Sequence, residues 1–180
     1  MKKLVIFLRG VNVNGISIKM DELKNVIESM SYKEVKTILA SGNVIAAAVD
    51  DSSYEAHKEK IEKTLSTYFK YESYIILKTA NQIHDIIKEA SGHIVPEGYH
   101  HYILLSNDNI VSEQLKVLFE TCMKDEKEQF ILGEHGMYWI VPKGNTLKSD
   151  FGNKVLGKKE FKSVLTSRTI NTILRMEKYL

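Results

Sequence analysis

The sequence predicts an α+β protein made of two small units. Helical patterns alternate with short aliphatic runs in the order β-α-β-β-α-β, and after a break the order begins again as β-α-β-β-α. The 180 residues, of which 43% are hydrophobic and 27% charged, suffice for one compact body or two fused units. Because this order is that of the split β-α-β unit, the predicted fold class is two tandem ferredoxin-like subdomains.

The first strand is an apolar run, Leu4–Leu8, that leads directly into Arg9. Such a run suits a strand buried on both faces, so Arg9 stands where the strand leaves the core. Apolar residues at helical spacing then predict an amphipathic helix over 20–30. Val35–Leu39 and Val44–Val49 predict the two strands of a hairpin, joined by a turn that contains glycine and asparagine.

Capping patterns place the next two helices. Ser52 and Glu55 have the spacing of a capping box and begin a helix, which the strand Tyr74–Leu77 follows. Thr79 and Gln82 have the same spacing and begin a short helix.

Glycine, proline and a break in periodicity coincide at Gly92–Gly98, which predicts subdomains at 1–92 and 99–180. No letter-by-letter repeat relates them, so the duplication is one of element order. The elements expected in the second subdomain are a strand at Tyr102–Leu105, a helix through Val111 and Leu115, a hairpin of Phe130–Leu132 and Met137–Val141, and a final helix through Ile170, Ile173 and Leu174.

Charge and cysteine content limit the possible disulfides, cellular location and binding partners of the protein. The single Cys122 excludes an internal disulfide, and without a signal-like or membrane-spanning segment we expect a cytoplasmic location. The net charge is +2, but residues 143–180 carry 9 Lys and Arg against 3 Asp and Glu. This basic segment suggests non-specific nucleic-acid contact through Lys143–Lys162, and a solvated helix face is the alternative.

The turn after the first strand has the composition of an anion site. Arg9 offers a guanidinium fork, Gly10 frees backbone N–H groups, and Asn12 adds an amide. The alternative is an internal salt bridge and a simple turn. Gly10 and Gly15 have the spacing of a phosphate-binding loop, but Ile16 stands where lysine is required, which excludes a P-loop NTPase.

Sheet topology predicts where this turn lies. In a split β-α-β unit the end of the first strand and the turn between the second and third strands meet at one edge. We therefore expect Arg9 near Ser41, Gly42 and Asn43, although the three turn residues alone are typical of a structural turn.

A second polar motif lies near the C-terminus. Thr166 or Ser167 is predicted to cap a helix, and Arg168 with the helix N–H groups would form a second anion site. Asn171 and Thr172 follow in the same motif. A cap with a surface arginine is the alternative, and the sequence leaves open whether both arginines share one cleft.

The sequence predicts no metal and no cofactor. The six histidines show no ligand spacing, since His100 and His101 are consecutive and His135 stands on a turn. No nucleophile elbow or catalytic triad can be assembled. The expected third strand has no aromatic residue, which argues against base-stacking RNA readout.

In several sequence motifs the chain resembles a mostly bacterial family known as domain of unknown function sixteen ninety-seven. The matching segments are LRGVNVNG, Met20-Asp21-Glu22-Leu23, VKTILASGNV and LTSRTINTILRM, where the family typically reads LLRGINVGG, MxxL, VxTYxxSGNVVF and TTRNWNTVLKL. The resemblance implies a cytoplasmic protein of two ferredoxin-like subdomains and supplies no activity. This chain departs from the pattern at Asn14, Leu39-Ala40 and Thr169-Ile170.

The functional hypothesis is a binding protein for a small anion, such as a phosphorylated metabolite or a nucleotide. An enzyme of unknown reaction at the same site and nucleic-acid binding through the basic segment are the alternatives, and oligomeric state is left open. The candidate ligand-binding residues are Arg9, Gly10, Asn12, Ser41, Gly42, Asn43, Arg168, Asn171 and Thr172.

Overall fold

The structure is a computed structural model that describes residues 1–10, 17–157 and 160–180. The chain forms two compact units. Unit 1 comprises Met1–Ile83 together with Arg175–Leu180, and unit 2 comprises His84–Leu174. The last residues, which the sequence assigns to the second subdomain, therefore return to the first.

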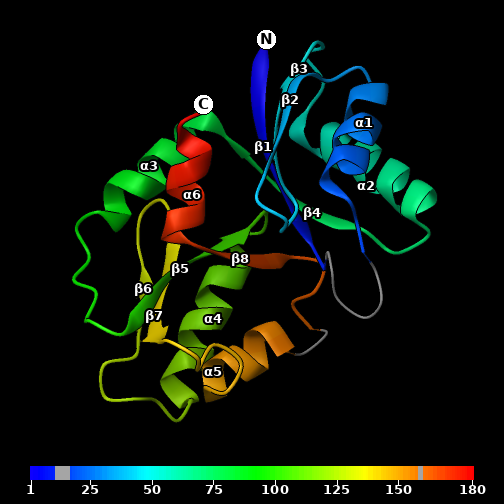
Figure 1. Cartoon of the computed structure of the whole chain (residues 1–180). Helices are drawn as coiled ribbons and strands as arrows, with labels where there is room; N and C mark the ends of the chain where they lie inside the picture. The colour runs from blue at the N-terminus through cyan, green and yellow to red at the C-terminus, as the bar shows by residue number, and fades with distance from the viewer. Residues whose placement is uncertain (11–16, 158–159) are drawn as a thin grey trace. The chain divides into compact units, whose positions relative to one another are not determined.

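Unit 1 contains a four-stranded sheet in the order β2-β3-β1-β4, with every neighbouring pair antiparallel. Helices α1 and α2 cover the same face of this sheet (Figure 1). The elements are β1 (Lys2–Arg9), α1 (Met20–Ser29), β2 (Lys33–Ile38), β3 (Asn43–Ala48), α2 (Tyr54–Phe69), β4 (Tyr74–Thr79) and α3 (Ala80–Ala90), whose last residues belong to unit 2.

The core of unit 1 forms where β1 meets these helices. Leu4, Ile6 and Leu8 pack with the buried faces of α1 and α2. Their neighbours Val5 and Phe7 point to the opposite face and are also 0% exposed. The first strand is thus buried on both faces, as the unbroken apolar run predicts.

Unit 2 repeats the strand arrangement with different residues. Its sheet has the order β6-β7-β5-β8, again with antiparallel neighbours. The elements are β5 (Tyr99–Ser106), α4 (Ile110–Thr121), β6 (Gln129–Leu132), β7 (Met137–Pro142), α5 (Asp150–Gly152), η1 (Asn153–Gly157), β8 (Leu165–Thr169) and α6 (Ile170–Glu177), whose last turn belongs to unit 1.

Trp139 and Phe151 centre the core of unit 2. Both are fully buried, with ring centroids 5.5 Å apart in edge-to-face geometry. The Trp139 indole N–H donates to Glu128 at 2.9 Å, which satisfies the polar group of this core aromatic.

The structure corrects the sequence prediction at the second polar motif. Thr166–Arg168 lies within strand β8, paired with β5, and α6 begins only at Ile170. The predicted helix cap at Thr166 or Ser167 is therefore wrong. The polar residues Thr166 and Ser167 are typical of a helix N-cap. The strand that pairs with β8 is distant in sequence, so a local pattern cannot reveal this pairing.

Two capping predictions have different outcomes. Thr79 and Gln82 form the expected reciprocal pair, each backbone N–H donating to the other side chain at 2.9 and 3.0 Å. Helix α2 is capped by Ser53, whose hydroxyl accepts from the Ala56 N–H at 3.1 Å, so the predicted cap at Ser52 is wrong by one residue.

Asn43 holds the β2–β3 turn. Its side chain is fully buried, and its amide donates to the Ile38 carbonyl at 3.0 Å and to the Ser41 hydroxyl at 2.8 Å. We expect Asn43→Ala to lower the free energy of unfolding by about 1–3 kcal/mol, because a buried carbonyl loses its donor. Urea denaturation measures the change.

The exposed helix variant Asn25→Ala is the control, with an expected effect within about 0.5 kcal/mol. Equal effects of the two substitutions would contradict the anchoring role of Asn43.

Candidate functional site

The predicted meeting of the first strand and the hairpin turn is confirmed. Phe7 pairs with Asn43 in the β1–β3 ladder, and the Leu8 N–H donates to the Gly42 carbonyl at 2.8 Å. The end of β1, with Arg9 and Gly10, therefore lies at the same sheet edge as Ser41–Asn43. Asn12, the remaining member of the first motif, lies outside the described residues.

At this edge, the side chains of the β2–β3 turn stabilise the turn itself. The Asn43 amide and Ser41 hydroxyl bond to each other and close the turn, and Gly42 adopts φ +71°, where a side chain would be strained. Arg9 is partly buried, and this burial lowers the pKa of its guanidinium, which stays charged at neutral pH. Arg9 thus carries the positive charge of the edge.

The candidate residues near the C-terminus make local contacts. The Arg168 guanidinium donates to the Thr166 hydroxyl at 2.8 Å and the Ser167 carbonyl at 2.7 Å. The Thr172 hydroxyl lies 3.1 Å from that of Thr169, and Asn171 is exposed. All of these residues belong to unit 2, whereas Arg9 belongs to unit 1.

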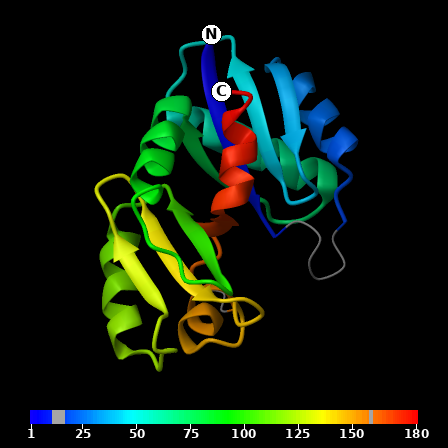
Figure 2. The ribbon, with the colours of Figure 1, turned by 60° about the vertical axis from the view of Figure 1, so that its left-hand side comes forward.

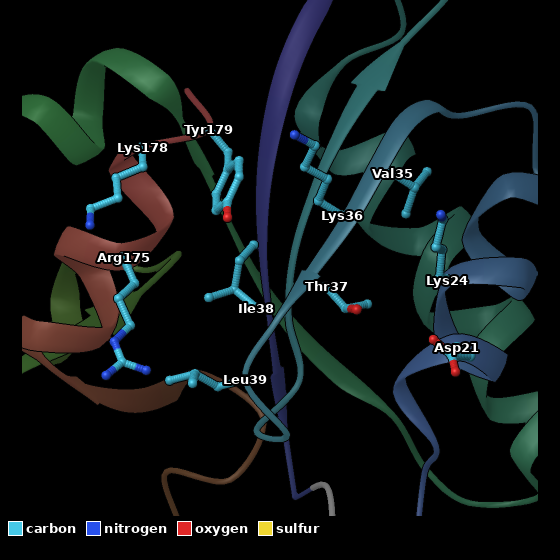
Figure 3. A pocket seen from close by; sticks show the side chains of 10 residues that line it. All are labelled: Asp21, Lys24, Val35, Lys36, Thr37, Ile38, Leu39, Arg175, Lys178 and Tyr179. Atoms are coloured by element: carbon cyan, nitrogen blue, oxygen red, sulfur yellow. The ribbon is translucent and has the colours of Figure 1, made fainter.

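A basic groove of about 860 Å³ lies along strand β2 in unit 1, next to this edge. We call it the β2 groove. Figure 3 shows the outermost strand at its centre, with α1 on one side and the end of the chain on the other. Its lining residues are Asp21, Lys24, Val35, Lys36, Thr37, Ile38, Leu39, Arg175, Lys178 and Tyr179.

Positive charge dominates the β2 groove, with four cations against the single carboxylate of Asp21. The Lys24 ammonium lies 3.8 Å from a carboxylate oxygen of Glu28, and the Lys36 ammonium lies 4.4 Å from the centroid of the Tyr179 ring. Over the described parts of the chain, no carboxylate lies within ion-pair distance of Arg175 or Lys178. Arg175 and Lys178 are exposed and line the groove, and no carboxylate of the described residues neutralises their charge.

The chain's last residues form one wall of the groove and are tied to β1. The Lys3 ammonium donates to the carbonyl oxygens of Tyr179 and Leu180 at 3.0 and 2.7 Å. Met176, on the preceding turn, is fully buried and anchors the segment. The two termini accordingly lie side by side (Figure 1 and Figure 2).

Local pattern gave little sign of the β2 groove. Lys24 and Lys36 read as solvent-facing positions of a helix and a strand. The available signal was the excess of basic residues near the C-terminus, which includes Arg175 and Lys178. Leu39 joins the groove to the predicted edge, because it lines the groove and begins the turn that leads to Ser41.

Unit 2 contains a separate polar cluster around Glu89. Its carboxylate accepts from the buried Tyr138 hydroxyl at 2.5 Å and from the backbone N–H groups of Glu134 and His135 at 2.7 and 3.2 Å. A Cβ on Gly133 would lie 2.3 Å from this carboxylate, so a side chain there would displace the Glu89 carboxylate from its present position. The cluster clamps α3 to the β6–β7 hairpin.

Two histidines extend this cluster. His93 Nδ1 lies 3.2 Å from His101 Nε2, and the His93 ring packs edge-on against Tyr138 with centroids 4.5 Å apart. Burial, with a further contribution from His93, lowers the pKa of His101 to about 4. For Glu89, burial acts to raise the pKa, but the hydrogen bonds from Tyr138 and the turn outweigh it and hold the pKa below its usual range.

Unit 1 also contains a buried histidine. His57 is 1% exposed, its Nδ1 lies 2.8 Å from the Tyr32 hydroxyl, and its Nε2 lies 3.6 Å from an Asp50 oxygen. Burial lowers its pKa more than Asp50 raises it. His57 is thus a neutral core residue at pH 7.

The residues 1–10, 17–157 and 160–180 hold no group of three or more His, Cys, Asp or Glu arranged for a metal ion. Cys122 is buried with its sulfur 3.8 Å from the Lys154 ammonium, and burial raises the pKa of the thiol. In the basic segment Lys143–Lys162, Lys154 is paired with Asp150 at 2.8 Å, and nucleic-acid contact stays a prediction. None of the described helices is long and apolar enough to cross a bilayer.

These features define a protein of two α+β units, each with a four-stranded antiparallel sheet and helices. The chain belongs to the family described as "Protein of unknown function (DUF1697)", whose profile matches residues 1–138. The resemblance predicted from the motifs is therefore confirmed at the level of the family.

The fold is shared with a solved structure, the conserved bacterial protein SP0830 from Streptococcus pneumoniae. The TM-score is 0.75 at 17% sequence identity, over 98% of this chain and 97% of that one. At this identity the likeness concerns the fold alone. No curated protein matches the sequence.

The lowered pKa of His101 predicts a pH dependence of stability. Between the folded pKa of about 4 and the unfolded pKa near 6.5, the unfolded chain binds a proton that the folded protein does not. The free energy of unfolding should therefore rise with pH across this window and lose the contribution as pH falls. Chemical denaturation at a series of pH values measures the slope.

We expect His101→Gln to reduce that slope by up to about 1.4 kcal/mol per pH unit, the value for one proton. His84→Gln, on an exposed position of α3, is the control for removing an imidazole. A His101→Gln slope equal to that of the wild type would contradict the assignment.

Proposed function

We propose that this protein binds an anionic ligand in the β2 groove, and that the negative groups of the ligand contact Lys36, Arg175 and Lys178. The observation that carries the proposal is the charge of the lining, which contains four cations and one carboxylate. Two of the cations, Arg175 and Lys178, form no ion pair with a carboxylate of the described residues. Clustered cations repel one another, so an anion that bridges them is stabilised by all of them at once.

The chemistry of the lining supports recognition of carboxylate or phosphate groups. Arg175 can offer two parallel N–H donors to such a group, and the lysine ammonium groups act as point charges beside it. Ile38 and Leu39 add apolar surface between the charges. The volume of about 860 Å³ lies in the range typical of ligand sites.

The site deduced from sequence joins this proposal at one end. Leu39 borders both the groove and the β2–β3 turn, and Arg9 stands at the same sheet edge. A phosphorylated metabolite or nucleotide, the ligand class suggested by the sequence, could place its negative group towards Arg9. We further infer that both units are of the ferredoxin-like type, because their strand orders and antiparallel pairings are the same.

Binding is a better account of this site than catalysis. Among the ten residues that line the groove, Asp21 is the only side chain that could serve as a base at neutral pH, and it is exposed. General base catalysis works best when environment tunes the pKa of a base towards the working pH. The groove therefore supports recognition of an anion more directly than its conversion.

Pyrophosphate is the probe that tests the proposal. We expect Arg175→Gln and Lys36→Gln each to weaken its binding about tenfold or more, because each removes a charge-assisted contact. Isothermal titration calorimetry at low and high salt measures the affinity, which should fall as salt screens the charges.

Lys63→Gln, an exposed lysine of α2 outside the groove, is the matched control and should bind like the wild type. Arg9→Ala tests separately whether the sheet edge contributes. Unchanged pyrophosphate binding in both groove variants, or no binding by the wild type, would refute the proposed function.

A further inference from the structure

We propose that the physiological occupant of the β2 groove is an extended acidic peptide segment that pairs with β2 as an added strand. This inference rests on the proposed function, because it names the partner class of the same basic groove. It adds a geometric requirement that a small phosphate does not have. The partner must be a polypeptide in extended conformation.

The floor of the groove carries this inference. Five consecutive residues, Val35–Leu39, line it. The first four lie in β2 and alternate between its two faces, and Leu39 follows the strand. β2 is the last strand of the sheet order, so its outer edge has no strand partner within the described chain. A groove lined by consecutive residues of an edge strand exposes that strand's backbone donors and acceptors to whatever lies in it.

Regular pairing limits where the added strand can lie. Lys36, Thr37 and Ile38 are in continuous register with β3, which leaves this stretch straight. Upstream the register shifts between Lys33 and Lys36, and Glu34 adopts φ +51°. Such an irregularity blocks pairing at that end, so the peptide would pair with the stretch that the cations surround.

The side chains of β2 alternate between two environments, as Figure 3 shows. Lys36 and Ile38 point towards the C-terminal segment with Arg175 and Lys178, whereas Val35 and Thr37 point towards α1. The α1 side combines the opposite charges of Lys24 and Asp21. The α6 side contains three cations and no lining carboxylate.

A strand added to β2 would show the same alternation. Side chains of the peptide on the α6 side would meet Lys36, Arg175 and Lys178, whereas those between them would meet the mixed α1 side. The geometry therefore selects acidic residues at every second position of the peptide and tolerates other residues between them. A peptide with the same composition but adjacent acidic residues cannot place them all on the basic side.

The edge distinguishes a peptide from a nucleic acid. A peptide can exchange N–H and C=O hydrogen bonds with β2 while its carboxylates contact the cations. A phosphodiester backbone has acceptors but no amide N–H donors for the carbonyl groups that an edge strand turns away from its neighbour. The combination of a basic lining and an open strand edge thus favours an acidic polypeptide.

Labelled peptides test the inference by fluorescence anisotropy with the full-length protein. The probe is a short capped peptide with Glu at alternate positions and Val or Thr between them. Three matched peptides carry adjacent Glu residues in the same composition, Lys in place of Glu, or N-methyl groups on alternate backbone amides. We expect the alternating peptide to bind at least tenfold more tightly than each of the three.

The protein variants locate the binding. Arg175→Gln and Lys36→Gln should each weaken the alternating peptide about tenfold, whereas Lys63→Gln should leave its affinity unchanged. Hydrogen exchange of the wild type should slow at those amides of Val35–Ile38 that face away from β3 when the peptide binds, which a purely electrostatic contact would not produce.

The outcomes separate the two proposals. If pyrophosphate binds at the groove but the alternating peptide does not, the inference fails and the proposed function stands. If neither binds, both fail. Equal affinity for the N-methylated or adjacent-Glu peptide would overturn strand pairing, and so would groove-dependent binding of a single-stranded oligonucleotide without any peptide binding.

Discussion

The pairing of β1 with a neighbour on each side is the constraint from which the rest of unit 1 follows. β1 lies between β3 and β4, and every residue from Leu4 to Leu8 is at most 1% exposed. A strand that is buried on both faces and paired on both edges can present polar groups only where it ends. Arg9 and Gly10 occupy that end, and the ladder with β3 brings the hairpin turn beside them.

The same sheet order makes β2 the outermost strand and gives the chain an open edge. Long, flat edges promote aggregation, and proteins commonly protect them with charge and irregularity. β2 has both features, in Lys36 and in the register shift upstream of it. The C-terminal segment adds Arg175 and Lys178 along this edge, so protection from aggregation and recognition of an anion can arise from the same residues.

Unit 2 shows how the same strand order is reached without the same residues. Its core is centred on the aromatic pair Trp139 and Phe151, where unit 1 uses aliphatic side chains on β1. Its hairpin turn is held by the carboxylate of Glu89, where unit 1 uses the amide of Asn43. Topology can therefore be conserved within one chain while the side chains that stabilise each turn differ.

The sequence by itself determined the fold class, the family, the strand on which unit 1 is built and the meeting of Arg9 with the hairpin turn. The family follows from the resemblance of several sequence motifs, and the other features follow from local periodicity and from the fixed connectivity of a β-α-β-β-α-β unit. The tertiary structure alone decided that Thr166–Arg168 pairs as a strand, that the last residues return to unit 1, and that Lys36 and Arg175 share a groove. Each depends on contacts between residues distant in sequence, which the local pattern of polar and apolar residues does not encode.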